Sequence, residues 1–400
     1  MDEAGKPWRA VRAAAQARAE ILGLPNTALE AWRYVDVKSL AQVPGSAAGR
    51  PTAAVMAPLR LADIPTLVLI DGVIAEYPAT GIVVGGLGDL STSERETLIA
   101  RWTALVAASD DVAECWSISG CAGGARITAT AGTLHLLSLS TGGSHGGRVV
   151  IEVPGNKKLD LIISHVDCAP SRACLGIEVS VADGGHLRVD ELQYAGHGAG
   201  TAQCLTTMRA TLGRDASMQW TTVAQGGELV RFRSTVSLDG PGASVSLAGL
   251  SVLDGRRQAH VHTRVVHAVG QTQSRQLFKT IADGQSIASF DGLVSVAPGA
   301  DGTDARQTNH NLLLSSRARV ETRPQLDILA DDVKASHGAT VGRPNPEELF
   351  YLRSRGLSSE QAMSVLMRGF ADEVLMAMTC GPARRMATRT VADLCLGRRE

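Results

Sequence analysis

The sequence predicts a mainly β protein with helical ends, whose central part is a β-solenoid. Apolar–polar alternation recurs in short segments from about residue 125 to 335, between turns rich in Gly, Asp and Pro. The same step from turn to strand returns in "DGGHLRV" (183–189), "GRDASMQW" (213–220) and "GPGASVSL" (240–247). This spacing of roughly 27 to 31 residues favours stacked coils. Because this repeat is imprecise, periodicity alone also allows a two-sheet sandwich as the alternative.

The composition fits this fold class. Gly contributes 42 residues, and aromatic residues make up only 4% of the chain, which suits short strands and tight turns with aliphatic packing. No long helical pattern separates the strand segments, so βαβ units are disfavoured. The strand segments are Val149–Val153, Leu159–Ile163, Ile177–Val181, Leu187–Val189, Met218–Val223, Val245–Leu250, Val261–Val266 and Leu326–Leu329. We expect three regions: 1–124 (helical and mixed), 125–337 (solenoid) and 338–400 (helical).

Ahead of the solenoid, the chain predicts helices and a hairpin. Residues 4–22 carry apolar side chains at helical spacing, and Gly23 ends the run. The stretch "TLVLIDGVIAEY" (66–77) predicts a small hairpin with Asp71-Gly72 at its turn. Residues 92–107 predict a further helix.

After residue 344 the sequence predicts two capped helices. Asn345 is a capping residue followed by Pro346 at the first helical position. Ser358 and Gln361 form the capping box of the second helix. Its apolar stripe consists of Ala362, Val365, Leu366, Phe370 and Val374. Packing on the chain's own core is the favoured interpretation of this stripe, and docking of a partner helix is the alternative.

Charge and cysteine content limit the function classes. Thirty-nine basic and 40 acidic residues give a formal charge of −1 without a polybasic run, so nucleic-acid binding is disfavoured. No stretch approaches the ~20 apolar residues of a membrane helix, and the first residues lack the apolar core of a signal peptide. Seven scattered Cys do not form a disulfide framework. We therefore expect a cytoplasmic protein.

Two Cys pairs are weak metal candidates. Cys115 and Cys121 share the spacing of Cys168 and Cys174, whereas paired metal ligands are usually two to four residues apart. We favour small buried hydrophobic residues as the interpretation of all four.

A cluster of histidines lies in one predicted strand. His260 and His262 fall on one face of it, and His267 falls on the other. The pair predicts either a polar ladder on a solvated face, which we favour, or a metal site.

His337 lies in "ADDVKASHGATVG" (330–342), where Asp331, Asp332 and Lys334 precede a predicted Ser-His-Gly turn. Its residues fit a turn histidine with satisfied hydrogen bonds or, less well, a functional ligand.

No catalytic motif is recognisable. The sequence has no Gly-x-Ser-x-Gly elbow, no phosphate loop and no His-Glu-x-x-His. A β-helix hydrolase or lyase acting on carbohydrate is the competing class, but aromatic residues for sugar stacking are scarce. We expect a protein that is not an enzyme.

Several stretches resemble the SufB/SufD family of iron–sulfur cluster assembly scaffolds. They are "AHVHTRVVHAVGQTQSRQLFKTIADGQSIASFDGLVSV" (259–296), "TDARQTNHNLLLSSRARVETRPQLDILADDVKASHGATVG" (303–342), "EELFYLRSRGLSSEQAMSVLMRGFADEVL" (347–375) and "LPNTALEAWRYVDVKSL" (24–40). The resemblance implies a right-handed parallel β-helix flanked by helices. It also implies a complex in which a SufB-like chain pairs with this one through the β-helices, while a SufC-like ATPase binds the C-terminal helices, with Phe350, Phe370, Val374 and Leu375 as the docking residues.

Two positions favour the SufD side of the family. SufB chains carry a cluster-building Cys where this sequence has Asn309, and a Glu where it has Gly338. A SufB-like scaffold acting alone is therefore a weaker alternative. His337 matches a SufD histidine that faces the SufB cysteine, although the Cys of the related "KCSHGAT" is Ala335 here.

The resemblance also sets expectations for ligands. It makes His337 a transient ligand of an iron–sulfur cluster at the SufB interface, with Asp331 and Asp332 as candidates to orient it. It implies no tightly bound cofactor in the isolated chain. Reduced flavin in the complex and a homodimer of the isolated chain are left open.

Overall fold

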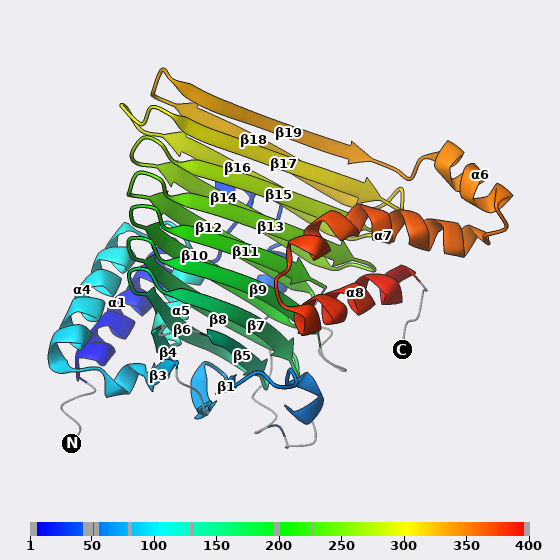
Figure 1. Ribbon diagram of the computed structural model, residues 1–400. Coiled ribbons are helices and arrows are strands. Elements are labelled where there is room, and N and C mark those ends of the chain that lie inside the picture. The colour runs from blue at the N-terminus through cyan, green and yellow to red at the C-terminus, as the bar shows by residue number, and fades with distance from the viewer. Residues whose placement is uncertain are drawn as a thin grey trace.

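The computed structural model describes residues 6–42, 51, 56–78, 82–128, 132–195, 201–225 and 227–395. Its centre is a parallel β-solenoid built from two long sheets, with helices at both ends of the chain (Figure 1). Sheet A has the strand order β19-β17-β15-β13-β11-β9-β7-β5-β1-β2, and sheet B has the order β18-β16-β14-β12-β10-β8-β6-β4-β3. From β4 onward, successive strands of the chain alternate between the two sheets, so each pair of strands makes one coil.

Apart from the short β4, the solenoid strands have similar lengths. Those of sheet A are β5 (Gly132–Ser140), β7 (Lys158–Asp167), β9 (His186–Ala195), β11 (Ser217–Ala224), β13 (Ser244–Leu253), β15 (Gln273–Ala282), β17 (Thr303–Leu313) and β19 (Val333–Gly342). Those of sheet B are β4 (Ala125–Thr128), β6 (Gly143–Val153), β8 (Ser171–Val181), β10 (Gln203–Leu212), β12 (Leu229–Leu238), β14 (Gln258–His267), β16 (Ile287–Val296) and β18 (Arg319–Ile328).

The three repeated turn-to-strand segments of the sequence mark successive coils of sheet A. Ser217 is the register partner of both His186 and Ser244 in parallel ladders, so the three turn-to-strand segments lie one above the other. The parallel pairing confirms the solenoid and excludes a sandwich of antiparallel sheets. The last strand continues to Gly342, beyond the boundary expected at residue 337.

The N-terminal region contributes helices and the first strands of both sheets. Its elements are α1 (Lys6–Leu22), η2 (Glu30–Trp32), α2 (Lys38–Ala41), η3 (Ala57–Leu59), β1 (Thr66–Ile70), β2 (Val73–Glu76), β3 (Val83–Gly86), η4 (Leu87–Asp89), α4 (Thr92–Ala108) and α5 (Val112–Ser119). The predicted hairpin is confirmed: β1 and β2 are antiparallel, with positive φ angles of 49° at Asp71 and 80° at Gly72. The two sheets therefore begin before residue 125, because β1 also pairs in parallel with β5.

A buried ion pair joins the N-terminal region to sheet B. The Asp111 side chain caps α5 and lies 2.7 Å from Nη1 of Arg231 on β12, and both side chains are fully buried. The Trp32 ring covers the Arg231 guanidinium at 4.0 Å from the ring centroid. Segment 24–42 thus lies over the outer face of sheet B, where the Asp36 N–H donates to Oε1 of Gln258.

The C-terminal helices are α6 (Pro346–Ser354), α7 (Ser359–Ala377) and α8 (Gly381–Cys395). Both predicted caps are confirmed: Asn345 accepts from the Glu347 N–H, and Ser358 with Gln361 forms a capping box. Helix α7 packs its apolar face on the outside of sheet A, in a cluster with Leu192, Leu250 and Ile281. Helix α6 instead projects away from the solenoid and buries none of its side chains (Figure 1).

Candidate functional site at the open end of the solenoid

The last coil, formed by β18 and β19, is the open end of the solenoid. Each of these strands is the terminal strand of its sheet, and no strand among the described residues pairs with their outer edges (Figure 1). Their backbone N–H and C=O groups on that side form a row without strand partners, which is the usual template for strand addition. Apolar side chains are exposed beside it, with Val341 47% and Leu329 61% accessible.

His337 lies on this coil, in the middle of β19. The predicted Ser-His-Gly turn is therefore wrong, since residues 333–342 form one extended strand. Val333 and Ala335 pack into the interior cluster with Ala305, so His337, two residues further on, also faces inward. The side chain is exposed because no further coil covers it.

Inward side chains change in character toward the open end. The sheet A column that ends at His337 contains Gln307 and Gln276 directly beneath it and Leu247 below those. Gln307 is 1% exposed and Gln276 3% exposed. This column is thus polar in its last coils, whereas its lower coils place Leu247 and Trp220 in the apolar core.

Asp331 and Asp332 lie too far along the chain to orient His337. The Asp332 N–H donates to Oδ1 of Asp301 at 3.2 Å, and its carbonyl accepts from the Gly302 N–H at 2.7 Å. Both acidic residues precede β19 in the turn. A strand rises about 3.3 Å per residue, which puts Asp332 roughly 16 Å from His337. We therefore correct the prediction that these carboxylates support the imidazole.

The two positions that separated SufD from SufB lie near His337. Asn309 is buried in β17, where its Nδ2 donates to the Phe278 carbonyl at 3.1 Å and its Oδ1 accepts from Asn311 Nδ2 at 2.6 Å. Gly338 has open space where a Cβ would stand. Packing within the chain therefore does not demand glycine at that position.

The three histidines of β14 are structural. His260 and His262 share one face of β14, as predicted, but segment 24–42 covers that face, and His260 is fully buried. A solvated ladder is therefore wrong. Burial, helped by the nearby Arg231 charge, lowers the pKa of His260 to about 3. His267 faces the interior and bonds Thr272 and Ser274. Among the described residues, no three His, Cys, Asp or Glu side chains gather as a metal site.

Burial also characterises the Cys pairs. Cys115, Cys121 and Cys174 are buried, and Cys168 is partly buried. Burial raises the pKa of Cys115 to about 11 and that of Cys174 to about 12. These thiols stay protonated at neutral pH, which favours their interpretation as packing residues.

Two predicted docking residues are not available at the surface. Val374 is fully buried and Leu375 is 2% exposed, both in the contact of α7 with sheet A. We correct the prediction for these two residues, because an apolar stripe packed on the chain's own sheet cannot also contact a partner in this conformation. Phe370 is half-buried, with the Lys279 ammonium 4.8 Å from its ring centroid.

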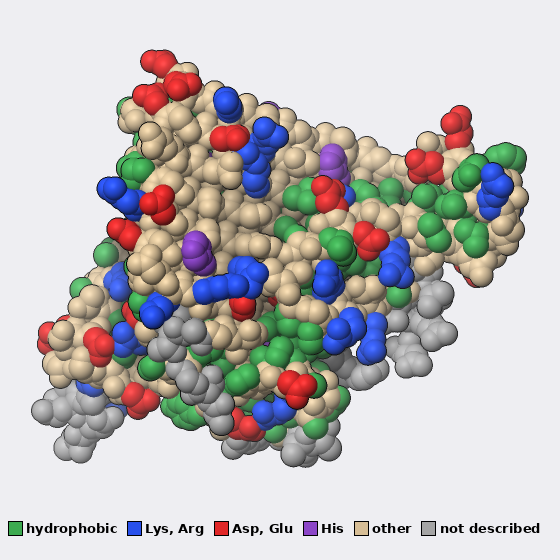
Figure 2. Space-filling view, in the orientation of Figure 1, with side chains coloured by type: hydrophobic (Ala, Val, Ile, Leu, Met, Phe, Trp, Pro, Cys, Tyr) green, Lys and Arg blue, Asp and Glu red, His purple; other side chains and the backbone are tan. Residues whose placement is uncertain are grey.

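Exposed aromatic side chains are found on α6. Phe350 is 73% exposed and Tyr351 58% exposed, and hydrophobic side chains are visible on this projection in Figure 2. Tyr351 was not predicted, although its position beside Phe350 on a short helix could have indicated it.

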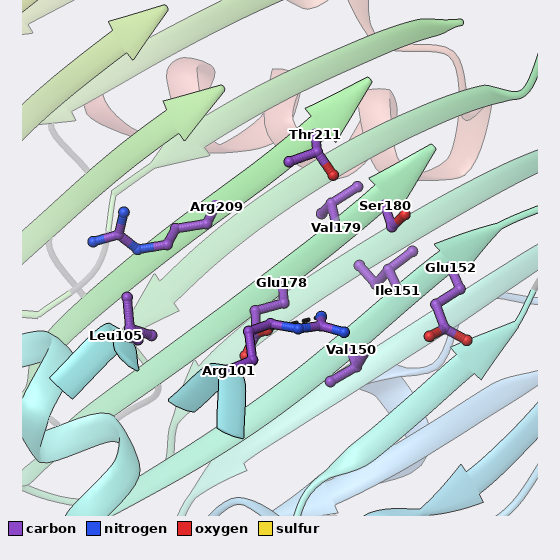
Figure 3. Close-up of a pocket in the computed structure, with 10 residues that line it drawn as sticks. All are labelled: Arg101, Leu105, Val150, Ile151, Glu152, Glu178, Val179, Ser180, Arg209 and Thr211. Atoms are coloured by element: carbon purple, nitrogen blue, oxygen red, sulfur yellow. Dashed lines mark hydrogen bonds and ion pairs between the residues drawn. The ribbon is translucent and has the colours of Figure 1, made fainter. Parts of the chain in front are cut away.

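A cavity of about 450 Å³ lies between α4 and the outer face of sheet B (Figure 3). Arg101 lies beside Glu178 within it, at 3.2 Å, and Glu178 also accepts from Arg148 and from the Trp102 indole N–H. Arg209 pairs with Glu114 at 2.7 Å. These ion pairs hold the N-terminal helices on the sheet.

Among the described residues, no helix is both long and apolar enough to cross a membrane.

Comparison with known proteins agrees with this architecture. Residues 137–370, more than half of the chain, match the family model for the SUF system FeS cluster assembly, SufBD core domain. The chain is 40% identical over 167 residues to the iron-sulfur cluster assembly protein SufD of Escherichia coli, which covers 42% of this chain and 40% of that protein. It is 37% identical over 179 residues to an iron-sulfur cluster assembly SufBD family protein of Mycobacterium leprae, covering 43% and 46%.

A plant relative is similar over a comparable span. The chloroplastic protein ABCI7 of Arabidopsis thaliana is 36% identical over 154 residues, covering 38% of this chain and 32% of that protein. The alignments thus span less than half of the length of these relatives. The family match does not support the carbohydrate-active alternative. From its solenoid, its terminal coil and the family match together, the chain belongs to the SufBD family of iron–sulfur cluster assembly proteins and is SufD-like.

Proposed function

We propose that this chain is a non-catalytic scaffold subunit that joins a SufB-like chain and a SufC-like ATPase, and that it offers His337 to a nascent iron–sulfur cluster. The observation that carries the proposal is the open terminal coil with an exposed histidine on its inner face. The six described thiols are free, which fits a reducing compartment, and we place the assembly in the cytoplasm.

The SufB-like chain is proposed to pair with the edges of β18 and β19. A β-solenoid with an uncovered end is prone to strand addition, because each edge amide gains a hydrogen bond when a partner strand arrives. Exposed Leu329 and Val341 would be buried by the same contact. A partner that is itself a solenoid would extend both sheets, and so would cover His337.

The chemistry of His337 suits a site from which the cluster must leave. Neutral imidazole is a borderline ligand, and it binds iron although it carries no negative charge. One imidazole from this chain, with a thiolate from the partner, leaves the coordination of the cluster incomplete. The cluster is cargo of the site and is bound only until it is transferred.

Helix α6 is the proposed contact for the SufC-like ATPase. Phe350 and Tyr351 are large exposed aromatic side chains on a helix that has no buried residue. Aromatic residues that become buried supply much of the energy of protein interfaces.

Co-expression with SufB-like and SufC-like chains from the same organism tests the proposal. We expect a three-protein complex by native mass measurement, and a loss of bound iron and sulfide in His337→Ala with the complex intact. The matched control is His310→Ala on neighbouring β17, whose imidazole bonds Thr340 at 2.7 Å. Equal iron contents in His337→Ala and the wild type would remove His337 from the function, and failure to bind either partner would refute the scaffold role.

A further inference from the structure

The amide of Gln307, directly beneath His337, lacks partners. Gln307 is 1% exposed, yet neither Nε2 nor Oε1 has a hydrogen-bond partner among the described residues. Buried amides are nearly always hydrogen-bonded, since an unpaired one loses its water without replacement. The unpaired amide therefore indicates a partner that arrives from a neighbouring group.

The side chains packed around the amide offer it no hydrogen-bond partner. A Cβ on Gly292 of β16 would lie 2.2 Å from the Gln307 Nε2, so Gly292 is what makes room for the amide there. The tilted pair of Phe278 and Phe290, with ring centroids 5.0 Å apart, lies in the same coils of the interior. Glycine and phenylalanine side chains provide no hydrogen-bonding atom. In the coil beneath, Gln276 Oε1 already accepts from the Thr263 hydroxyl at 2.7 Å, and the unpaired Gln276 Nε2 is a donor. An acceptor for the Gln307 Nε2 is therefore left to the coil above.

His337 is the polar group of that coil in register with Gln307. The strands β17 and β19 lie one spacing of about 4.8 Å apart, within reach of a glutamine amide and an imidazole on the same face. The other inward side chains of β19 are apolar: Val333, Ala335, Ala339 and Val341. On β18 the inward Thr322 also has a buried hydroxyl without a partner, but its register partner is Phe290.

We propose that Gln307 is the positioning residue of His337, holding the imidazole by an amide hydrogen bond so that one ring nitrogen is presented at the open end. This inference rests on the proposed function of His337. The two side chains do not bond each other in the structure, and the bond forms by rotation of the exposed ring. A bond to one ring nitrogen fixes the tautomer and leaves the lone pair of the other free for a metal ion.

Nitrogen-15 NMR of the full chain labelled in histidine tests the inference without any cluster. The His337 ring signals are assigned by their loss in His337→Ala, and the tautomer ratio follows from the two ring nitrogen shifts. In Gln307→Met we expect this ratio to change by about fivefold, the factor for a net hydrogen bond of ordinary strength. The matched control, Gln276→Met, alters the next amide down the same column and should leave the ratio as in the wild type.

Methionine keeps the length of the side chain and removes an unpaired buried amide, so Gln307→Met should fold with at least the wild-type thermal midpoint. The inference is overturned if the tautomer ratio of His337 is the same in Gln307→Met and the wild type. It is also overturned if Gln276→Met changes this ratio as much as Gln307→Met does. The function proposed for His337 is judged separately. If His337→Ala keeps its iron while Gln307→Met shifts the tautomer, the positioning contact is real and the cluster role is wrong.

Discussion

Asp111 and Arg231 form a fully buried ion pair, with 2.7 Å between Oδ2 and Nη1. The carboxylate belongs to the N-cap of α5 and the guanidinium belongs to β12. The contact therefore fixes the N-terminal helices on sheet B. Trp32 closes the site on the other side of the guanidinium, which explains why segment 24–42 lies over that face.

Removal of the carboxylate should be costly. Asp111→Ala leaves the Arg231 charge buried without its partner, for which we expect a loss of about 3–5 kcal/mol in the free energy of unfolding. The control is Asp110→Ala, whose side chain is 76% exposed in its pair with Arg233 and should cost below about 1 kcal/mol. Denaturant unfolding of both variants measures the difference. Similar losses would show that the buried pair has no special role.

Stability should fall as the pH is lowered from about 6.5 toward 4. Burial lowers the pKa of His135 and of His267 to about 4, and that of His260 to about 3. An unfolded histidine binds its proton near pH 6.5, so below that value protonation favours the unfolded chain. The thermal midpoint measured from pH 7 to 4 should decline steadily, and His267→Gln should flatten the decline. A midpoint that is constant over this range contradicts the burial of these neutral imidazoles.

A further loss is expected below pH 4. Burial alone would raise the pKa of Asp111, but the charges of Arg231 and Arg233 lower it to about 2. Stability from this carboxylate is present above the unfolded value near 4 and is lost as the pH falls toward 2. Asp111→Asn should lose less stability than the wild type between pH 4 and 2 when unfolding is followed by circular dichroism.

Helix α6 should bind the SufC-like ATPase through its exposed aromatic side chains. Phe350→Asp removes an anchor that is 73% exposed in this chain, so we expect at least a tenfold weaker affinity with an unchanged thermal midpoint. The matched control is Val365→Asp on α7, which is 48% exposed and should bind normally. Val374→Asp should instead unfold the helix from sheet A, since it places a charge in the core. Wild-type affinity of Phe350→Asp, measured by calorimetry, would contradict docking at α6.

The repeat could be predicted from the sequence because each coil needs the same turn. Positive φ angles at Gly184, Asp215 and Gly242 fall on the three echoed segments, and few residue types tolerate that conformation. Helix caps were predictable for a similar reason, since Asn345 and Ser358 act on backbone groups two or three residues away.

Interactions that depend on distant segments could not be predicted in this way. The apolar stripe of α7 has the same spacing whether Val374 meets sheet A or a partner. Proximity in the sequence was also a poor guide to contacts of His337. Asp332 is near His337 along the chain, but an extended strand separates the two residues. Gln307 is 30 residues away in the sequence and lies beside His337 in the sheet. His337 itself was expected in a turn because small residues surround it. The apolar residues of β19 do alternate along the strand, but His337 interrupts the alternation at its centre.

The most direct test of the central claim is amide hydrogen exchange of this chain, measured alone and in complex with the SufB-like partner. The amides of β18 and β19 that point away from β16 and β17 should exchange rapidly in the isolated chain and become strongly protected in the complex, while those of interior strand β13 stay protected in both. A stable complex in which β18 and β19 exchange as fast as in the isolated chain would contradict the claim that the open terminal coil is the surface that meets the partner.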